Sequence, residues 1–181
     1  MPSAPAAVIA MSDTVLRIAD TIQDSIVDGP GFRFVVFTQG CLRHCPECHN
    51  PHTWDPNGGK EVTVDSLYKI LSSNPLTDGI TLSGGEPYLQ AAACAELAQR
   101  AKAGGFNVWC YSGYTFEEII EIAKTDAGFK ALIEATDVLI DGMFLIEEKS
   151  LTLKWRGSQN QRVIDVRKSL ENGEVVLHAN R

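Results

Sequence analysis

The sequence predicts an α/β fold, built as an incomplete β/α barrel with mostly parallel strands. Segments with strand-like and helix-like apolar periods alternate along the chain, which is typical of parallel β/α units. The chain has 181 residues, whereas a complete eight-unit barrel takes about 250. Its 44% hydrophobic and 22% charged residues are typical of one packed domain. We expect residues 15–181 to form this domain and residues 1–14 to be a mobile tail.

The first half of the chain begins with two strands and a helix. Apolar residues of one parity predict a strand over residues 16–26, and the turn residues 28–31 end it. The β-branched and aromatic residues 32–37 predict a second, buried strand. Residues 62–73 place their apolar side chains on one helical face, with Thr63 as the N-cap.

The second half repeats the alternation. Residues 79–82 predict a strand, and residues 89–103 predict a helix that stops at two glycines. A strand over residues 106–111 precedes a helix opened by a capping box from Thr115 to Glu118. The remaining expected elements are a helix at 129–135, strands at 137–140 and 162–166, and a short helix with an edge strand within 168–178. Because parallel strands share one carboxyl edge, we expect function there.

Charge and hydropathy exclude several classes of partner. Sixteen Lys and Arg against 23 Asp and Glu give a net charge of −7, which argues against a nucleic acid as partner. No apolar stretch approaches the roughly 18 residues of a membrane span. The apolar residues 4–11 lack the basic region of a secretory signal. We therefore expect a cytoplasmic protein with no membrane contact.

Three of the five cysteines lie close together, at Cys41, Cys45 and Cys48. An odd number of cysteines with one tight cluster is unlike a disulfide framework and favours metal or redox chemistry. Cys94 lies on an expected helix face and Cys110 in an expected strand, so we interpret both as core residues.

The Cys-x3-Cys-x2-Cys spacing leaves one ligand position open. A four-iron cluster ordinarily takes four cysteines, and a structural zinc takes four protein ligands. For zinc, His44, His49 or His52 could complete the site, whereas an open iron could bind a small molecule. The spacing favours iron and sulfur, and the polar character of the loop argues against core cysteines.

A second motif, Ser83–Pro87, lies between an expected strand and helix. Its glycines would let the backbone approach a ligand closely, and Glu86 could accept an ammonium group. Alone it is also typical of a tight turn with Pro87 near a helix start. Its combination with the cysteine loop is the stronger indication of a site.

With these two motifs the sequence resembles the radical S-adenosylmethionine superfamily. Further motifs resemble the activating proteins of anaerobic ribonucleotide reductase: Asp28–Arg33, Cys48–Trp54, Val138–Phe144 and Trp155–Gln161. Glu47 departs from the aromatic residue common in the wider superfamily, as is normal in this smaller group. The chain also has no second cysteine cluster for a ferredoxin-like insert.

The resemblance implies a 4Fe-4S cluster on Cys41, Cys45 and Cys48, with S-adenosylmethionine chelating the fourth iron. One electron would cleave the cofactor to methionine and a 5′-deoxyadenosyl radical, which takes a hydrogen atom from a glycine of the partner. The implied cofactor contacts are Glu47, Cys48, His49, Gly84, Gly85, Glu86, Ser112 and Asp141. The implied partners are the glycyl radical subunit of an anaerobic ribonucleoside-triphosphate reductase and a small electron donor such as flavodoxin or ferredoxin.

Two alternatives remain open at this point. The first is a radical S-adenosylmethionine enzyme acting on a small molecule such as a deazapurine precursor, which should lack the Trp155–Gln161 motif. The second is a binding module stabilised by zinc or a cluster, in which Gly84–Pro87 is only a turn. The short length favours a protein substrate, because an incomplete barrel leaves one side open.

Overall fold

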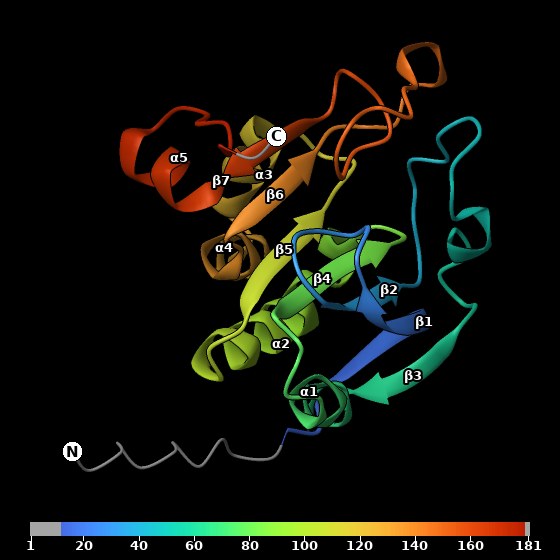
Figure 1. Cartoon of the computed structure of the whole chain (residues 1–181), viewed down its shortest axis with the longest axis vertical. Coiled ribbons are helices and arrows are strands. Elements are labelled where there is room, and N and C mark those ends of the chain that lie inside the picture. The colour runs from blue at the N-terminus through green and yellow to red at the C-terminus, as the bar shows by residue number, and fades with distance from the viewer. Residues whose placement is uncertain (1–11, 180–181) are drawn as a thin grey trace.

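The computed structural model describes residues 12–179 and consists of one seven-stranded sheet with helices packed against it (Figure 1). The strand order is β3-β1-β2-β4-β5-β6-β7, so β3 and β7 form the two edges and the sheet does not close on itself. Most of the predicted N-terminal tail, residues 1–11, lies outside the described residues.

The strands confirm the expected incomplete barrel. Their bounds are β1 Val15–Ser25, β2 Arg33–Thr38, β3 Lys60–Thr63, β4 Gly79–Gly84, β5 Asn107–Tyr111, β6 Val138–Asp141 and β7 Arg162–Asp165. The four central strands β2, β4, β5 and β6 are parallel, whereas β1 and β7 run antiparallel to their neighbours. Strand β3, which is antiparallel to β1, therefore points the same way as the four central strands. The carboxyl ends of these five strands lie at one end of the sheet.

Two of the helices begin directly after the capping side chains that the sequence predicts. The helices are α1 Val64–Ser73, α2 Ala91–Ala103, α3 Phe116–Ala123, α4 Ala127–Ala135 and α5 Val166–Asn172. Thr63 caps α1 by accepting from the Ser66 amide, and Thr115 and Glu118 form the expected capping box of α3. None of the helices between residues 12 and 179 is long and apolar enough to cross a membrane.

Several boundaries differ from the sequence-based expectation. Residues 60–63 form the edge strand β3, so the first helix starts at Val64 and not at residue 62. Pro87–Gln90 forms a 3-10 turn, which delays α2 to Ala91. The expected terminal edge strand is reduced to a single bridge between Leu177 and Ile164.

The two faces of the sheet have different roles because side chains alternate along each strand. On the helix-covered face, residues such as Phe34, Ile80 and Cys110 belong to the main core. The opposite face carries a smaller apolar cluster that includes Trp109 and Ile140. This second face leads to the site at the carboxyl edge of the strands.

At the other end of the sheet, where the parallel strands begin, the Asp28–Arg33 segment packs against the strand ends. The Arg33 guanidinium is fully buried and donates to Thr81 Oγ1 (3.1 Å) and the Ile80 carbonyl (2.5 Å), and it also bonds the Asn107 side chain. Burial lowers its pKa to about 10. Gly31 has φ +73° and no room for a Cβ, which would lie 2.2 Å from Asp78 Oδ2. This motif therefore has a clear structural role.

Candidate active site

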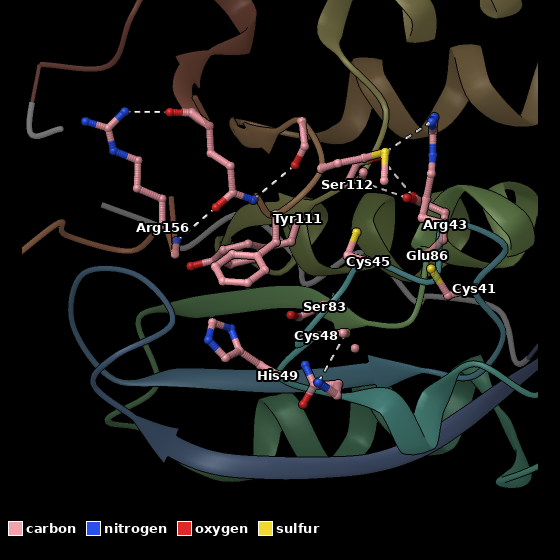
Figure 2. A pocket seen from close by; sticks show the side chains of 18 of the residues that line it. Cys41, Arg43, Cys45, Cys48, His49, Ser83, Glu86, Tyr111, Ser112 and Arg156 are labelled. Carbon is pink, nitrogen blue, oxygen red and sulfur yellow. Dashed lines mark hydrogen bonds between the residues drawn. The ribbon is translucent and has the colours of Figure 1, made fainter. Parts of the chain in front are cut away.

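A cavity of about 540 Å³ opens at the carboxyl ends of the central strands (Figure 2). Its volume lies in the usual range for small-molecule and cofactor sites. The predicted site residues that line it are Cys41, Cys45, Cys48, His49, Gly84, Gly85, Glu86 and Ser112. The cysteine loop and the strand-end motifs thus meet in one space.

Both ends of the cysteine loop are tied together where it leaves β2. The Gly40 amide donates to the Thr53 carbonyl (2.7 Å), and the Cys41 amide donates to the Trp54 carbonyl (3.1 Å). The His44 ring stacks on Trp54 with ring centroids 4.7 Å apart. These contacts hold the loop so that its three thiols face the cavity.

All three thiols are free and partly exposed. Burial raises the pKa of Cys41 and Cys45, so their thiolates require a cationic partner. A cluster of iron ions supplies such charge. The donor set therefore fits a cluster held by three cysteines.

The histidines considered for zinc have other surroundings. His44 stacks on Trp54, His49 packs against Phe144 with centroids 4.9 Å apart, and His52 is exposed in a 3-10 turn. In residues 12–179, no three His, Cys, Asp or Glu side chains are placed to hold a single metal ion such as zinc, whereas in a 4Fe-4S cluster each cysteine binds a different iron.

The two glycines of the second motif permit close backbone packing. Gly84 has φ +94°, and a Cβ there would lie 2.6 Å from the Phe37 Cα. A Cβ on Gly85 would lie 2.4 Å from the Gly40 carbonyl oxygen. The end of β4 therefore packs directly on the residue that precedes Cys41.

Glu86 is 2% exposed and lies at the cavity wall. Its carboxylate accepts from the Tyr88 amide (3.1 Å), the Ser112 hydroxyl (2.9 Å) and the Gly113 amide (2.8 Å). Burial raises its pKa to about 6, against the lowering effect of these donors and of the Arg43 charge. Glu86 thus joins the β4 and β5 ends and places a negative charge beside the cavity.

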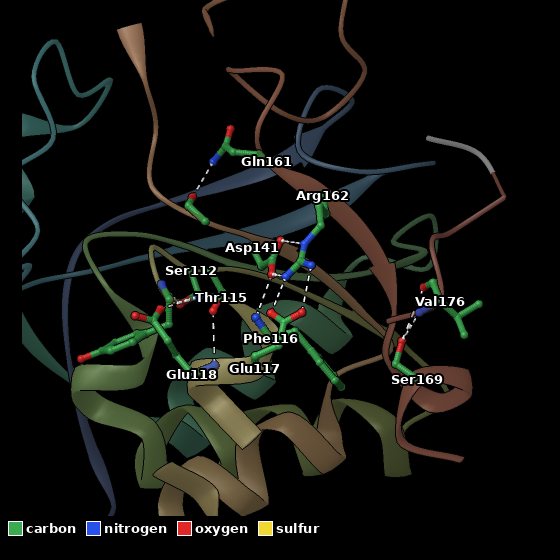
Figure 3. Close-up of polar contacts among 12 residues, drawn as sticks. Ser112, Thr115, Phe116, Glu117, Glu118, Asp141, Gln161, Arg162, Ser169 and Val176 are labelled. Carbon is green, nitrogen blue, oxygen red and sulfur yellow. Dashed lines mark hydrogen bonds and ion pairs between the residues drawn. The ribbon is translucent and has the colours of Figure 1, made fainter. Parts of the chain in front are cut away.

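Two predicted cofactor contacts do not line the cavity. Glu47 is exposed, with φ +53°. Asp141 is 1% exposed but turns away: its carboxylate accepts from the Phe116 amide (2.7 Å) and from Arg162 Nε (3.0 Å) (Figure 3). Asp141 joins β6 to α3 and β7, and its neighbour Gly142 lines the cavity instead.

Arg43 is a cavity residue that sequence reasoning did not single out. It lies between the first two cysteines, and its guanidinium carbon is 4.1 Å from the centroid of the Tyr114 ring. Its Nη2 is 3.5 Å from Glu118 Oε2 at the start of α3. The sequence contains no local signal for these long-range contacts.

The far wall of the cavity is the loop between β6 and β7. The Gln161 side chain accepts from the Gly157 amide (2.9 Å) and donates to the Gly142 carbonyl (3.0 Å). Asn160 Nδ2 donates to the Met143 carbonyl (2.8 Å). The Trp155–Gln161 motif, whose single roles the sequence did not reveal, thus contains residues that shape this wall.

The second part of this loop, after Glu147 and Glu148, is basic in an acidic chain. Residues 149–161 contain three cationic side chains, Lys149, Lys154 and Arg156, and no acidic one. Leu151 at the tip is 93% exposed and lines the cavity mouth together with Lys149. The mouth therefore presents cationic and apolar groups to any incoming molecule.

A family model described as a 4Fe-4S single cluster domain matches residues 27–164. The anaerobic ribonucleoside-triphosphate reductase-activating protein of Vibrio cholerae is 36% identical over 75% of this chain and 89% of its own length. The protein of that name from Escherichia coli K12 is 36% identical over 78% of this chain and 94% of its own length. The pyruvate formate-lyase 1-activating enzyme of Escherichia coli K12 is 37% identical over 82% of this chain, but only 60% of its own length is covered.

Proposed function

We propose that this chain, which belongs to the radical S-adenosylmethionine enzymes that activate glycyl radical enzymes, acts on an anaerobic ribonucleoside-triphosphate reductase. The observation that carries the choice of partner is the Trp155–Gln161 motif, which resembles that of the reductase activators and shapes a wall of the cavity. The matched segment extends over 89–94% of the reductase activators and 60% of the pyruvate formate-lyase activators.

Cys41, Cys45 and Cys48 are the proposed ligands of three irons. A bound 4Fe-4S cluster supplies one electron for reductive cleavage of S-adenosylmethionine. The Gly84–Gly85 backbone would lie along the methionine end of the cofactor, and the His49 ring would lie against its nucleoside. Glu86 would place its charge beside the cationic cofactor, and its bond from Ser112 would keep that carboxylate oriented.

A polypeptide substrate must reach this cavity from outside. Lys149 and Leu151 are exposed at the mouth, and there the partner's glycine-bearing segment would enter. A segment that covers the mouth also keeps water from the cofactor. Glu47, on the exposed cysteine loop, would lie at the nucleoside side of the same opening.

The choice of partner is tested with two glycyl radical enzymes in parallel. The cluster-loaded protein is mixed anaerobically with S-adenosylmethionine, a reductant, and either an anaerobic ribonucleotide reductase or a pyruvate formate-lyase. We expect the doublet of a glycyl radical in electron paramagnetic resonance only with the reductase. A doublet only with the lyase would overturn the proposed partner. Cleavage of the cofactor without a doublet from either enzyme would contradict both the reductase and the lyase as partners.

The ligand assignment is tested by comparing Cys45→Ala with Cys94→Ala. Loss of one of three thiolates should reduce the iron content well below the about four irons per chain of a full cluster. Cys94 is fully buried and does not line the cavity, so its variant should retain the cluster and S-adenosylmethionine cleavage. Iron analysis and absorption spectra measure the outcome, and equal iron loss in both variants would refute the assignment.

A further inference from the structure

Arg43 connects the cysteine loop to the rest of the molecule. It is the second residue after Cys41, yet its side chain reaches Tyr114, Glu118 and Met143, which lie outside that loop. Its guanidinium lies over the Tyr114 ring at 4.1 Å, and Nη1 is 4.0 Å from Met143 Sδ. Figure 2 shows the Arg43 side chain beside Glu86, with Cys41 and Cys45 close by.

The partner ring is itself fixed. Tyr114 packs against the main core and contacts Tyr88 and Phe129 edge-on. Its amide donates to Ser112 Oγ (3.0 Å), and its carbonyl accepts from the Gly142 amide (3.1 Å). A cation stacked on an immobile ring is therefore held at a defined place.

The neighbouring glycine leaves room for this arrangement. A Cβ on Gly113 would lie 3.0 Å from Arg43 Cγ and 3.4 Å from Glu86 Oε2. The absence of a side chain at this position lets the Arg43 stem pass close to the β5 end. The packing thus accommodates an arginine at residue 43 and leaves little room for a side chain at residue 113.

The charge of Arg43 is only partly compensated. The carboxylate within 4 Å among the described residues is Glu118, at 3.5 Å, and its side chain is 49% exposed. Arg43 itself is 25% exposed, so water screens its field incompletely. A positive charge at this place stabilises negative charge that is added to a cluster on the three cysteines.

We propose that Arg43 is a positioning residue that clamps the cysteine loop onto α3 and keeps a positive charge beside the cluster, which favours the reduced cluster. The inference rests on the proposed ligands Cys41, Cys45 and Cys48, but it is independent of which enzyme is the partner. Arg43 then contributes in two ways. Its stacking on Tyr114 holds the cysteine loop in place, and its charge raises the midpoint potential of the cluster.

The test is a redox titration of cluster-loaded variants with a chemical reductant, combined with iron analysis and the rate of iron loss to a chelator. Arg43→Gln should lower the midpoint potential, with a roughly tenfold smaller ratio of reduced to oxidised cluster, which is about 59 mV for one electron. Glu118→Gln, which removes the compensating charge, should raise it. Arg43→Lys should keep most of the potential but lose iron faster, because lysine keeps the charge without the planar stack.

A matched control removes the same charge far from the cavity. Arg167 on α5 is 84% exposed, and Arg167→Gln should leave both potential and iron loss unchanged. If Arg43→Gln has the wild-type potential, or if Glu118→Gln does not move it upward, the inference is overturned. If Arg43→Gln loads no cluster, Glu118→Gln remains the test: a higher midpoint potential supports the inference, and an unchanged or lower one overturns it. Failure of the wild-type chain to bind iron would instead contradict the proposed ligands.

Discussion

Two buried carboxylates at strand ends, Glu86 and Asp141, have nearly the same exposure but different partners. Glu86 is 2% exposed, and its hydrogen-bond donors within residues 12–179 are two backbone amides and a hydroxyl, all neutral. Asp141 is 1% exposed and forms an ion pair with Arg162 at 2.5 Å. The sequence predicts both as cofactor contacts, yet only Glu86 lines the cavity.

The difference lies in which cation reaches each acid. Arg162, at the start of β7, neutralises Asp141 and also binds Glu117. Arg43 lies near Glu86 but places its guanidinium on Tyr114 and Glu118. Glu86 is therefore left with charge that an incoming cation can balance, whereas the charge of Asp141 is already balanced inside the protein.

The largest effect is expected from Arg162→Gln, which leaves Asp141 buried without its cation. We expect a loss of about 2–3 kcal/mol in the free energy of unfolding, below the full cost of a broken buried pair because Arg162 is 32% exposed. Urea unfolding measures it. Binding of S-adenosylmethionine to the folded variant should change less than twofold. Lost binding without lost stability would place Asp141 in the site.

A smaller effect is expected from the titration of Glu86. Its pKa of about 6 in the folded protein lies above its ordinary value of 4.5, so the folded state binds this proton more tightly than the unfolded state. Its contribution to stability is therefore full below pH 4.5 and lost as the pH rises through 6. From below pH 4.5 to above pH 6 we expect wild type to lose about 2 kcal/mol of unfolding free energy relative to Glu86→Gln.

This pH effect is measured by urea unfolding of both proteins across pH 4 to about 7, since other groups titrate equally in both. If the free energies of unfolding of the two proteins change in parallel with pH, Glu86 is not buried as described. Because the same carboxylate faces the cavity, we also expect weaker S-adenosylmethionine binding by wild type below pH 6 but no such pH step in Glu86→Gln.

The smallest effect is expected from Glu117→Gln, which removes the exposed partner of Arg162. Glu117 is 61% exposed, and exposed ion pairs contribute about 0.5 kcal/mol. The difference from wild type should disappear in about 1 M salt, where such charges are screened. A loss as large as that of Arg162→Gln would show that Glu117, and not Asp141, is the main partner of the arginine.

Much of the fold could be predicted because its signals are local. Thr63 and the Thr115–Glu118 box mark the helix starts, and β-branched runs mark the central strands. β3 was missed because its four residues continue directly into the apolar pattern of α1. The antiparallel direction of β7 could not be predicted, because it depends on a long connection without a crossover helix and direction is not encoded in the strand itself.

The candidate site could be predicted where it consists of contiguous motifs. The three cysteines and Gly84–Glu86 each occupy one short segment, and the order of strands brings the segments together. The place of Asp141 depends on Arg162, which is 21 residues away in sequence. Arg43 depends in the same way on Tyr114 and Glu118. Such pairings are decided by tertiary packing, which spacing in one sequence does not reveal.

The contact of Gly85 with Gly40 makes the cysteine loop observable by amide hydrogen exchange. The amides of Gly85 and Glu86 donate to the carbonyls of Thr38 and Gly40, each at 2.8 Å, across the junction of the two segments. These protons exchange with solvent only when the start of the cysteine loop separates from the end of β4. Their exchange rates therefore report, residue by residue, how firmly the loop is closed before and after iron is bound.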